Sequence, residues 1–439
     1  MRKIKCFILL FIINIFLLGF DKTIAQNDTI SYIPELIPYR KGDLWGYCNK
    51  EKKIIIPIKY QEAEPFNDSI AIVKFDDKYG LINKNGGNIT PFKYNVIRDF
   101  QGGMAAVCVR YKGIIWFSEW GYINKNGEEI IRPEYTEVED FKNGFAKVFY
   151  KTKNYLINSK GKKIIDTHLI ISELSEGFMV IKSQMGRHSY IDSTGHFIKY
   201  LKNSQTEYLF PESYIPSRDN RTAKISYSLI KDAHKFSQGL AAIMLHNEWY
   251  YVNKQLEIII KLPVNCDFTS YFCEDRALIA IKDINSKYKY GFIDLEGNEI
   301  IKCKYEYANE FKNGVAIVKL DGKYGFINKD GEEIIPLIYD NALDFEESFA
   351  LVCFNYKWGY INNKGEEIIP CKFDGASEFC NGIARIKLNG KVGYIDELGK
   401  VIILNKYDEG LNYYNGLIKV KYNSKWGFID RNGNEYWEN

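Results

Sequence analysis

Few residues in this 439-residue sequence are of the types and spacings that carry chemistry. No two histidines have the His-Glu-x-x-His spacing of a zinc site, and neither a Gly-rich phosphate loop nor a Gly-x-Ser-x-Gly nucleophile turn is present. The five histidines are scattered along the chain: His168, His188, His196, His234 and His246. We therefore predict that the protein is not an enzyme and has no catalytic residue, no metal ligand and no cofactor.

Three short polar segments have some likeness to calcium loops. Asn-x-Asn-Gly or Asn-x-Asp-Gly stands at residues 83–86, 124–127 and 328–331. A calcium loop also needs a bidentate acid at a fixed distance downstream, and none of the three segments has one. Asn, Asp and Gly are also the residues that tight turns prefer. We interpret the segments as hairpin turns.

The cysteines suggest packing rather than crosslinking or redox chemistry. Eight of the nine lie after residue 25, and no Cys-x-x-Cys pair is present. In the repeat described below, Cys108 and Cys353 occupy one position and Cys303 and Cys371 another, with the members of each pair two or more repeats apart. Such separations should exceed the roughly 7 Å between Cα atoms that a disulfide tolerates. We expect free thiols, with Cys48 in the core.

One phrase dominates the sequence. Aromatic-Gly-aromatic-Ile-Asn/Asp recurs eleven times, mostly at an interval of 34 residues. We call the first residue of each copy an anchor; the anchors are Trp45, Tyr79, Trp120, Asn154, His188, Trp249, Tyr290, Tyr324, Trp358, Val392 and Trp426. A fixed period of this size indicates a tandem array, in which each unit leans on its neighbours to bury its apolar face.

Each copy is predicted to be a three-stranded meander followed by a connector. In residues 309–343, an alternating run at 314–318 leads through Asp321-Gly322 to a second run at 323–328, and 329–331 leads to a third that ends at Pro336. A Gly stands seven residues after the anchor in nine copies, the exceptions being Lys52 and Leu256. We expect a turn there whose last residue has a positive φ.

The anchors and their glycines are the main candidate site residues. Exposed rings in a row could bind sugars or peptides. We favour a structural role, in which each ring fills the core between units and the glycine leaves room for a neighbouring ring. The residues concerned are Trp45, Gly46, Tyr79, Gly80, Trp120, Gly121, Trp249, Tyr290, Gly291, Tyr324, Gly325, Trp358, Gly359, Trp426 and Gly427.

The phrases also carry a resemblance to a known family. Lys-Trp-Gly-Tyr-Ile-Asn at 357–362, Lys-Trp-Gly-Phe-Ile-Asp at 425–430 and Glu-Glu-Ile-Ile-Pro at 366–370 resemble those of bacterial WG-repeat (KWG-type) proteins. The resemblance extends over residues 33–437, although several copies depart from the pattern. It implies a β-rich repeat domain and, by itself, no activity.

Two all-β architectures suit eleven units of about 34 residues. An open, twisted, solenoid-like array has no limit on the number of units. A β-propeller usually has about four to eight blades, so eleven units would need one unusually large ring or two rings. Because the first and last units look whole, with no strand shared between the chain ends, we favour the open array.

The N-terminus predicts export. Arg2, Lys3 and Lys5 precede an apolar run at 6–20, and Thr23-Ile24-Ala25 has the small residues of a cleavage site, so residues 1–25 are expected to be a signal peptide. The chain has 59 basic and 56 acidic residues, and residues 1–25 contain four and one of them, which leaves 55 of each. This balance gives no reason to expect nucleic acid as a partner.

A 61-residue gap between anchors divides the array into repeats 1–5 (26–200) and repeats 6–11 (230–439). The insertion at 201–229 is polar, and we select its aromatic side chains as a candidate contact loop: Tyr208, Phe210, Tyr214 and Tyr227. We expect an exported protein, periplasmic, secreted or peripherally bound to the envelope, that binds a protein partner. Binding of a glycan or the cell wall through the anchors is the alternative.

Overall fold

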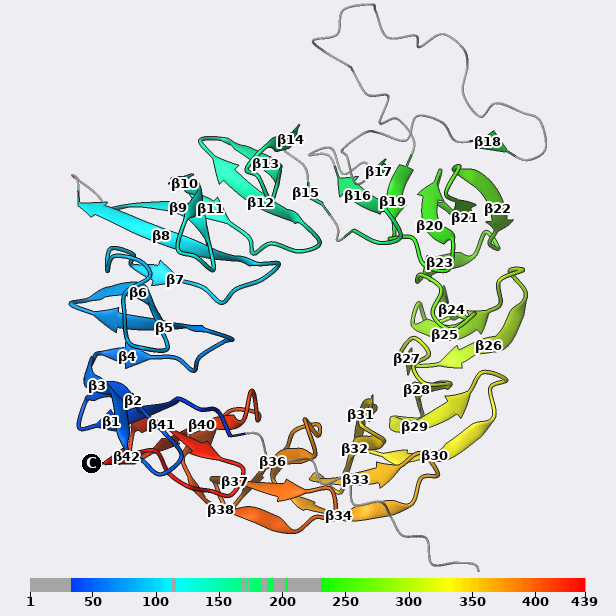
Figure 1. The fold of residues 1–439 in the computed structure, drawn as a ribbon. Coiled ribbons are helices and arrows are strands. Elements are labelled where there is room, and N and C mark those ends of the chain that lie inside the picture. The colour runs from blue at the N-terminus through cyan, green and yellow to red at the C-terminus, as the bar shows by residue number, and fades with distance from the viewer. Residues whose placement is uncertain are drawn as a thin grey trace, which may run out of the picture.

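The computed structural model describes residues 33–112, 116–167, 170–171, 174–182, 188–192, 202–203 and 230–438. Within these ranges the secondary structure consists of β-strands and turns, without a helix. The strands form eleven small sheets. Figure 1 shows the sheets following one another around a ring. The predicted all-β tandem array is therefore confirmed.

In chain order the strands up to the middle of the array are β1 (Ile37–Lys41), β2 (Leu44–Cys48), β3 (Ile54–Tyr60), β4 (Glu62–Ala63), β5 (Ile70–Phe75), β6 (Lys78–Asn83), β7 (Val96–Ile97), β8 (Met104–Lys112), β9 (Trp116–Asn124), β10 (Glu129–Tyr135), β11 (Glu137–Val138), β12 (Phe145–Tyr150), β13 (Lys153–Asn158), β14 (Lys163–Thr167), β15 (Ile170–Ile171), β16 (Phe178–Lys182), β17 (His188–Asp192) and β18 (Lys202–Asn203). The remaining strands are β19 (Ile230–Ala233), β20 (Leu240–Leu245), β21 (Glu248–Asn253), β22 (Glu257–Lys261), β23 (Cys266–Thr269), β24 (Ala277–Lys282), β25 (Tyr288–Ile293), β26 (Glu299–Tyr305), β27 (Tyr307–Ala308), β28 (Val315–Leu320), β29 (Lys323–Asn328), β30 (Glu333–Tyr339), β31 (Asn341–Glu346), β32 (Phe349–Phe354), β33 (Lys357–Asn362), β34 (Glu367–Phe373), β35 (Gly375–Ala376), β36 (Ile383–Leu388), β37 (Lys391–Asp396), β38 (Val401–Tyr407), β39 (Glu409–Gly410), β40 (Leu417–Tyr422), β41 (Lys425–Asp430) and β42 (Trp437–Glu438).

A typical sheet contains the predicted meander and one further strand. In the order β27-β28-β29-β30, the last three are the expected antiparallel strands. The predicted end of the third strand at Pro336 is wrong: β30 continues to Tyr339, because the proline lies in a register irregularity where its missing N–H is tolerated. The connector from the preceding unit adds β27, which pairs with β28 through Tyr307↔Lys319 and Ala308↔Val318. The connector is thus a short edge strand of the following sheet, which ties consecutive units together through backbone hydrogen bonds.

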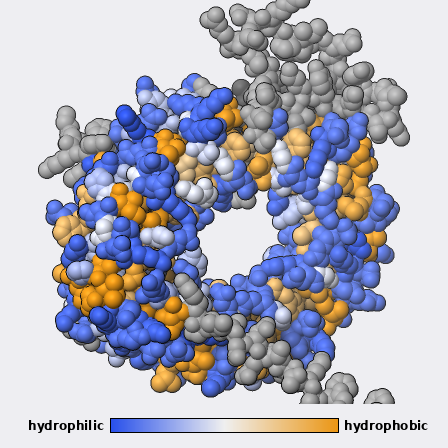
Figure 2. All heavy atoms as spheres, in the orientation of Figure 1, coloured by the Kyte–Doolittle hydropathy of each residue, from blue (hydrophilic) through white to orange (hydrophobic). Residues whose placement is uncertain are grey.

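The ends of the array meet, so the expectation of an open array is wrong. β42 pairs in parallel with β1, and the first sheet has the order β3-β2-β1-β42. The closed ring is the propeller-like alternative, in one ring of more sheets than the usual four to eight. Figure 2 shows an opening through its centre with a largely hydrophilic rim. The units look whole in sequence because the shared strand is only two residues long.

Tight turns join the strands as predicted. The residue seven positions after the anchor has a positive φ both where it is Gly, as in Gly331 (83°) and Gly365 (78°), and at the two exceptions, Lys52 (61°) and Leu256 (58°). A Cβ on Gly331 would lie 3.1 Å from Ile301 of the preceding sheet. Gly therefore meets two requirements at this position, a left-handed backbone and a close approach to the neighbouring unit.

The contact that repeats between sheets is made by the third residue of the phrase, and not by the anchor. Tyr360 is 1% exposed, its ring lies 4.7 Å from that of Phe379 in the next sheet, and its hydroxyl donates to Ser377 O at 2.7 Å. Tyr47 and Tyr122 make the same bonds, to Glu64 O and Glu139 O. Six units fasten to the next by a buried tyrosine ring and its hydrogen bond. In the other five the third residue is a buried Phe or Leu, which contributes packing alone.

The glycine after the anchor has a different role from the one expected. A Cβ on Gly359 would lie 2.6 Å from both Ile369 O and Cys371 N, which belong to the third strand of the same sheet. That strand has a register irregularity between Trp358 and Tyr360. The glycine thus leaves room for bulged backbone within its own sheet. At Gly427 the nearest atoms do belong to a ring, that of Trp437.

The extra length of the two 41-residue gaps is placed partly as predicted. The first forms the long hairpin of β8 and β9. In the second, some of the extra length lies in the β24–β25 hairpin and some earlier, in the turn where Cys266 N donates to Pro263 O at 2.9 Å. The predicted signal peptide at 1–25 and the contact-loop residues Tyr208, Phe210, Tyr214 and Tyr227 lie outside the described residues.

A buried histidine, His188, and a half-buried one, His234, lie where β17 meets β19. His188 Nδ1 is 3.0 Å from Lys231 O, and the ring of His234 lies 5.2 Å from that of Trp249. Burial lowers the pKa of both imidazoles, although the nearby Asp232 carboxylate opposes this, and for His188 Lys182 adds to it. The environment of both rings therefore favours the neutral imidazole.

We predict that Gly359→Ala destabilises the protein by about 1–3 kcal/mol, because the added methyl group forces the bulged backbone of β34 outwards. Gly375→Ala is the matched control, since its Cβ would meet only Lys387 Cβ at 3.6 Å and its φ is not positive. This control should change stability by less than about 1 kcal/mol. Urea denaturation measures both, and equal effects would contradict the role assigned to Gly359.

We predict that stability falls as the pH drops below about 6.5, the ordinary pKa of an unfolded histidine. Because the folded-state pKa of His234 is depressed, its contribution is present above that value and is lost as the imidazole becomes protonated. His234→Phe keeps the ring contact and should flatten the pH dependence of the urea midpoint between pH 7 and 5. If the urea midpoint of His234→Phe depends on pH as strongly as that of the wild type, other titratable groups cause the dependence.

Candidate functional site at the ring seam

The predicted anchors are distributed one per unit. Trp45 and Trp249 are buried, and the other aromatic anchors, Tyr79, Trp120, Tyr290, Tyr324, Trp358 and Trp426, are half-buried. Most of them pack at the edge of a core cluster, as Trp358 does beside Phe373 and Phe379. None of the aromatic anchors is fully exposed, so a ladder of free rings is not present in the described units.

Ring closure brings the first and last anchors together. We call the junction of β1, β2 and β42 with β40 and β41 the seam. A cavity of about 300 Å³ lies there. Its lining consists of Arg40, Asp43, Trp45, Glu62, Ala63, Glu64, Lys419, Lys425 and Trp426. Two aromatic anchors and six charged side chains thus meet at one place in the ring.

Arg40 is the charged residue buried at the base of the seam. It is 4% exposed; Nε donates to Trp426 O at 2.9 Å and Nη1 to Gly42 O at 2.6 Å. In two other units the anchor carbonyl accepts a backbone N–H from the end of the third strand, as Trp249 O does from Leu262 N. Since β42 turns away to pair with β1, the guanidinium takes that place at Trp426. Burial lowers the pKa of Arg40, with Asp43 opposing the shift.

Ion pairs surround the cavity. Lys425 Nζ lies 2.6 Å from Asp43 Oδ1, and Lys419 Nζ lies 2.8 Å from Glu64 Oε1. The Lys425 ammonium holds the pKa of Asp43 below its usual range. Both pairs join residues from opposite ends of the chain. The seam is therefore fastened at its surface by charges as well as at its base by Arg40.

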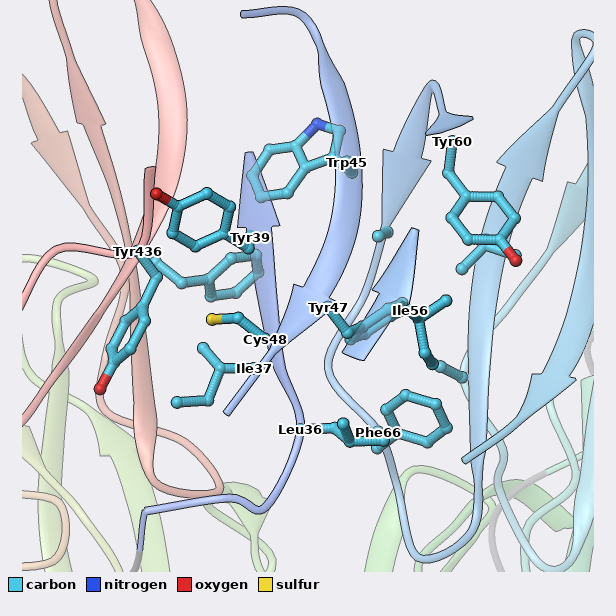
Figure 3. Packing of buried hydrophobic residues seen from close by; sticks show 14 of the residues in the cluster. Leu36, Ile37, Tyr39, Trp45, Tyr47, Cys48, Ile56, Tyr60, Phe66 and Tyr436 are labelled. Atoms are coloured by element: carbon cyan, nitrogen blue, oxygen red, sulfur yellow. The ribbon is translucent and has the colours of Figure 1, made fainter. Parts of the chain in front are cut away.

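An apolar core lies beside these charges. Figure 3 shows the first sheet with buried side chains on both sides, Tyr39, Ile37 and Cys48 toward Tyr436, and Tyr47 toward Phe66. Burial raises the pKa of the Tyr39 hydroxyl to about 12, helped by its hydrogen bond to Glu438. The first sheet is thus enclosed between two neighbours, like an internal unit of the array.

The described residues show few features of other site types. They contain no group of three or more His, Cys, Asp or Glu side chains placed to hold a metal ion. The eight described cysteines are free thiols. No helix with the length and apolar character of a membrane span occurs in the described ranges.

Trp45 and Trp426 are both predicted as anchors, but their proximity is not predicted from the sequence. Arg40 is not among the predicted site residues. The two anchors are 381 positions apart, and a period of 34 residues says nothing about whether its ends meet. One signal was present: Arg40 interrupts an apolar strand, Ile37–Lys41, at a position that proves to be buried. A charged residue at such a position indicates a specific partner.

Comparison with protein families gives one match. A family model described as "WG containing repeat" matches residues 45–79, 79–112, 120–151, 290–324, 324–358, 358–391 and 393–426, together more than half of the chain. The matched segments start at or next to seven of the anchors. No curated protein matches the sequence significantly.

Solved structures show only distant likenesses. A eukaryotic initiation factor is 10% identical over 91% of this chain and 94% of its own, with a TM-score of 0.38. BamB from Moraxella catarrhalis is 10% identical over 85% and 97%, with a TM-score of 0.31. PorZ, a surface component of the type-IX secretion system of Porphyromonas gingivalis, is 9% identical over 86% and 51%, with a TM-score of 0.27. Likenesses this weak transfer no feature to this chain.

We predict that Arg40→Met loosens the seam, because Trp426 O loses its charged donor while the aliphatic part of the side chain is retained. The cost should be about 1.5–3 kcal/mol. Hydrogen exchange should accelerate in β1, β41 and β42 and stay unchanged in β28–β30. The control is Lys41→Met, whose side chain is 63% exposed and pairs with Glu438 at the surface. If hydrogen exchange in β1, β41 and β42 is equally fast in both variants, the role assigned to Arg40 is contradicted.

Proposed function

Because the chain belongs to the family of WG containing repeat proteins and closes into a ring, we propose that it is a non-enzymatic binding or scaffold protein that engages a protein partner. A rigid ring of near-identical units offers the same side chains at regular places around its surface, a property that repeat proteins use to hold extended partners.

One observation carries the proposal: an isoleucine stands ten residues after the anchor in nine of the described units. We call this set the isoleucine band, and it consists of Ile55, Ile89, Ile130, Ile164, Ile259, Ile300, Ile334, Ile368 and Ile402. Five members are between 37% and 51% exposed. The next residue, as in Ile301 and Ile335, fills the core. The other four members pack against core clusters. The five exposed members therefore add apolar surface that the core does not use, which favours a protein partner.

The cellular setting is also a proposal. We propose that residues 1–25 direct export and are removed, so that the mature chain starts at Gln26 and acts in the periplasm, at the cell surface or outside the cell. N-terminal sequencing of the protein recovered from the envelope and medium of its source organism tests this. The balanced charge of the mature chain gives no support for nucleic acid as a partner.

We predict that the full-length ring captures a saturable protein partner from the envelope or medium of its source, and that a triple variant of the isoleucine band, Ile259→Ser, Ile300→Ser and Ile368→Ser, weakens capture at least tenfold. Loss of about 1–2 kcal/mol of apolar burial per side chain is the physical reason. Quantitative pull-down at graded protein concentrations measures the effect.

The matched control replaces three exposed apolar residues outside the band, Val264→Ser, Ile284→Ser and Leu343→Ser. Capture by this control should equal that of the wild type. If both triple variants retain capture, the band is not the contact surface. Deletion of residues 201–229 then tests the insertion with its four aromatic side chains. If the wild-type ring captures no stoichiometric protein, the protein-binding proposal fails.

A further inference from the structure

The topology of the seam leaves one anchor without the neighbour that other anchors have. Trp45, Tyr324 and Trp358 are each paired across the sheet with an aromatic residue at the end of the third strand, as Trp358 is with Phe373. In the described structure β41 has no third strand at Trp426, because β42 joins β1. Trp426 instead lines the seam cavity.

The size and wall of the cavity fit one small ring-shaped molecule. Its volume of about 300 Å³ is at the lower end of the roughly 300–1,000 Å³ typical of small-molecule sites. Trp426 provides a half-buried indole, with Lys421 Nζ 5.7 Å from the ring centroid. An indole offers a flat apolar face, against which the C–H face of a sugar ring can stack.

The polar lining selects for a neutral ligand with many hydroxyl groups. The three cations, Arg40, Lys419 and Lys425, are balanced by three carboxylates, Asp43, Glu62 and Glu64. Lys419 and Lys425 are already paired with Glu64 and Asp43, and Glu62 pairs with Lys74 and accepts from Tyr79. A charged ligand would have to separate such pairs. A hydroxyl group can add to them, since it donates to a carboxylate and accepts from an ammonium without displacing either.

We propose that the seam cavity binds a single neutral pyranose, such as the terminal residue of a glycan. Trp426 stacks on the sugar ring, and Lys425 and Glu62 at the wall bond to its hydroxyl groups. Arg40, whose Nε and Nη1 already donate to backbone carbonyls, positions Trp426 by holding its carbonyl. This site is separate from the isoleucine band, so the ring would hold a protein partner and a sugar independently.

A free amino acid or other zwitterion is the competing ligand class. Its carboxylate and ammonium would need an unpaired cation and an unpaired anion in the cavity, and both lysine ion pairs would have to open. The stacked indole also offers nothing specific to a small aliphatic zwitterion such as glycine. The geometry therefore favours the sugar, and glycine serves as the opposing probe.

The test uses the full-length protein with the methyl pyranosides of glucose, galactose and mannose, and with N-acetylglucosamine. Binding is followed by saturation-transfer NMR and by tryptophan fluorescence. At least one sugar should bind saturably at one site per chain. Trp426→Ala should weaken that binding at least tenfold, and the matched anchor variant Trp358→Ala should change it less than twofold.

Two further variants guard against loss of folding. If Trp426→Ala does not fold, Lys425→Gln and Glu62→Gln replace it. Each should weaken binding about three- to tenfold and lower stability by less than about 1 kcal/mol, because the ion pairs that they remove lie at the surface. The proposal is overturned if no sugar binds at up to about 50 mM, if Trp358→Ala weakens binding as much as Trp426→Ala, or if glycine binds more tightly than every sugar. Each result is independent of whether a protein partner is captured.

Discussion

The buried aromatic ring at the third position of the phrase is the contact on which the rest of the ring depends. This residue is aromatic in nine of the eleven copies and packs against the next sheet. In the six copies with tyrosine it also bonds to a backbone carbonyl there, as Tyr360 does beside Phe379 with Ser377 O. Because both interactions are made in a solvent-free interface, they fix the distance and the orientation between sheets together. Repetition of a similar step around the array brings the two ends together, where β42 pairs with β1.

Glycine has two distinct roles in keeping that step uniform. Within a sheet, Gly359 and its equivalents let the third strand bulge against the second. Between sheets, the positive-φ glycine of the second turn, such as Gly331, lets the turn rest on a buried isoleucine of the preceding unit. The third strand of the meander, such as β30, lies at the other edge of the sheet and is irregular in register. With its proline and its charged glutamate it is a poor template for pairing with another chain. The units thus stack through faces and leave their edges unpaired.

Much of the unit could be predicted from sequence, since its signals are local. The Asp321-Gly322 turn, the three alternating strands and the left-handed residue of the second turn, even at Lys52 and Leu256, are each determined by a few neighbouring residues. The role of Gly359 is not predicted, because the proline of the third strand is interpreted as the end of that strand. Pro370 instead lies in the bulged backbone that approaches Gly359. Closure could not be predicted either. It depends on a small angle accumulated over every unit, and on Arg40 and Trp426, which lie 386 positions apart and belong to no common repeat position.

The closed seam has a consequence for how the chain folds. Contacts within and between neighbouring units join residues that are close in sequence, so sheets can form and stack from any point along the array. The contacts at the seam join residues nearly four hundred positions apart and can form only when the whole arc is in place. Until then, the first and last sheets each have an uncovered apolar face. Two unfinished chains at high concentration can cover these faces by joining end to end, so closure of one ring competes with exchange of ends between two.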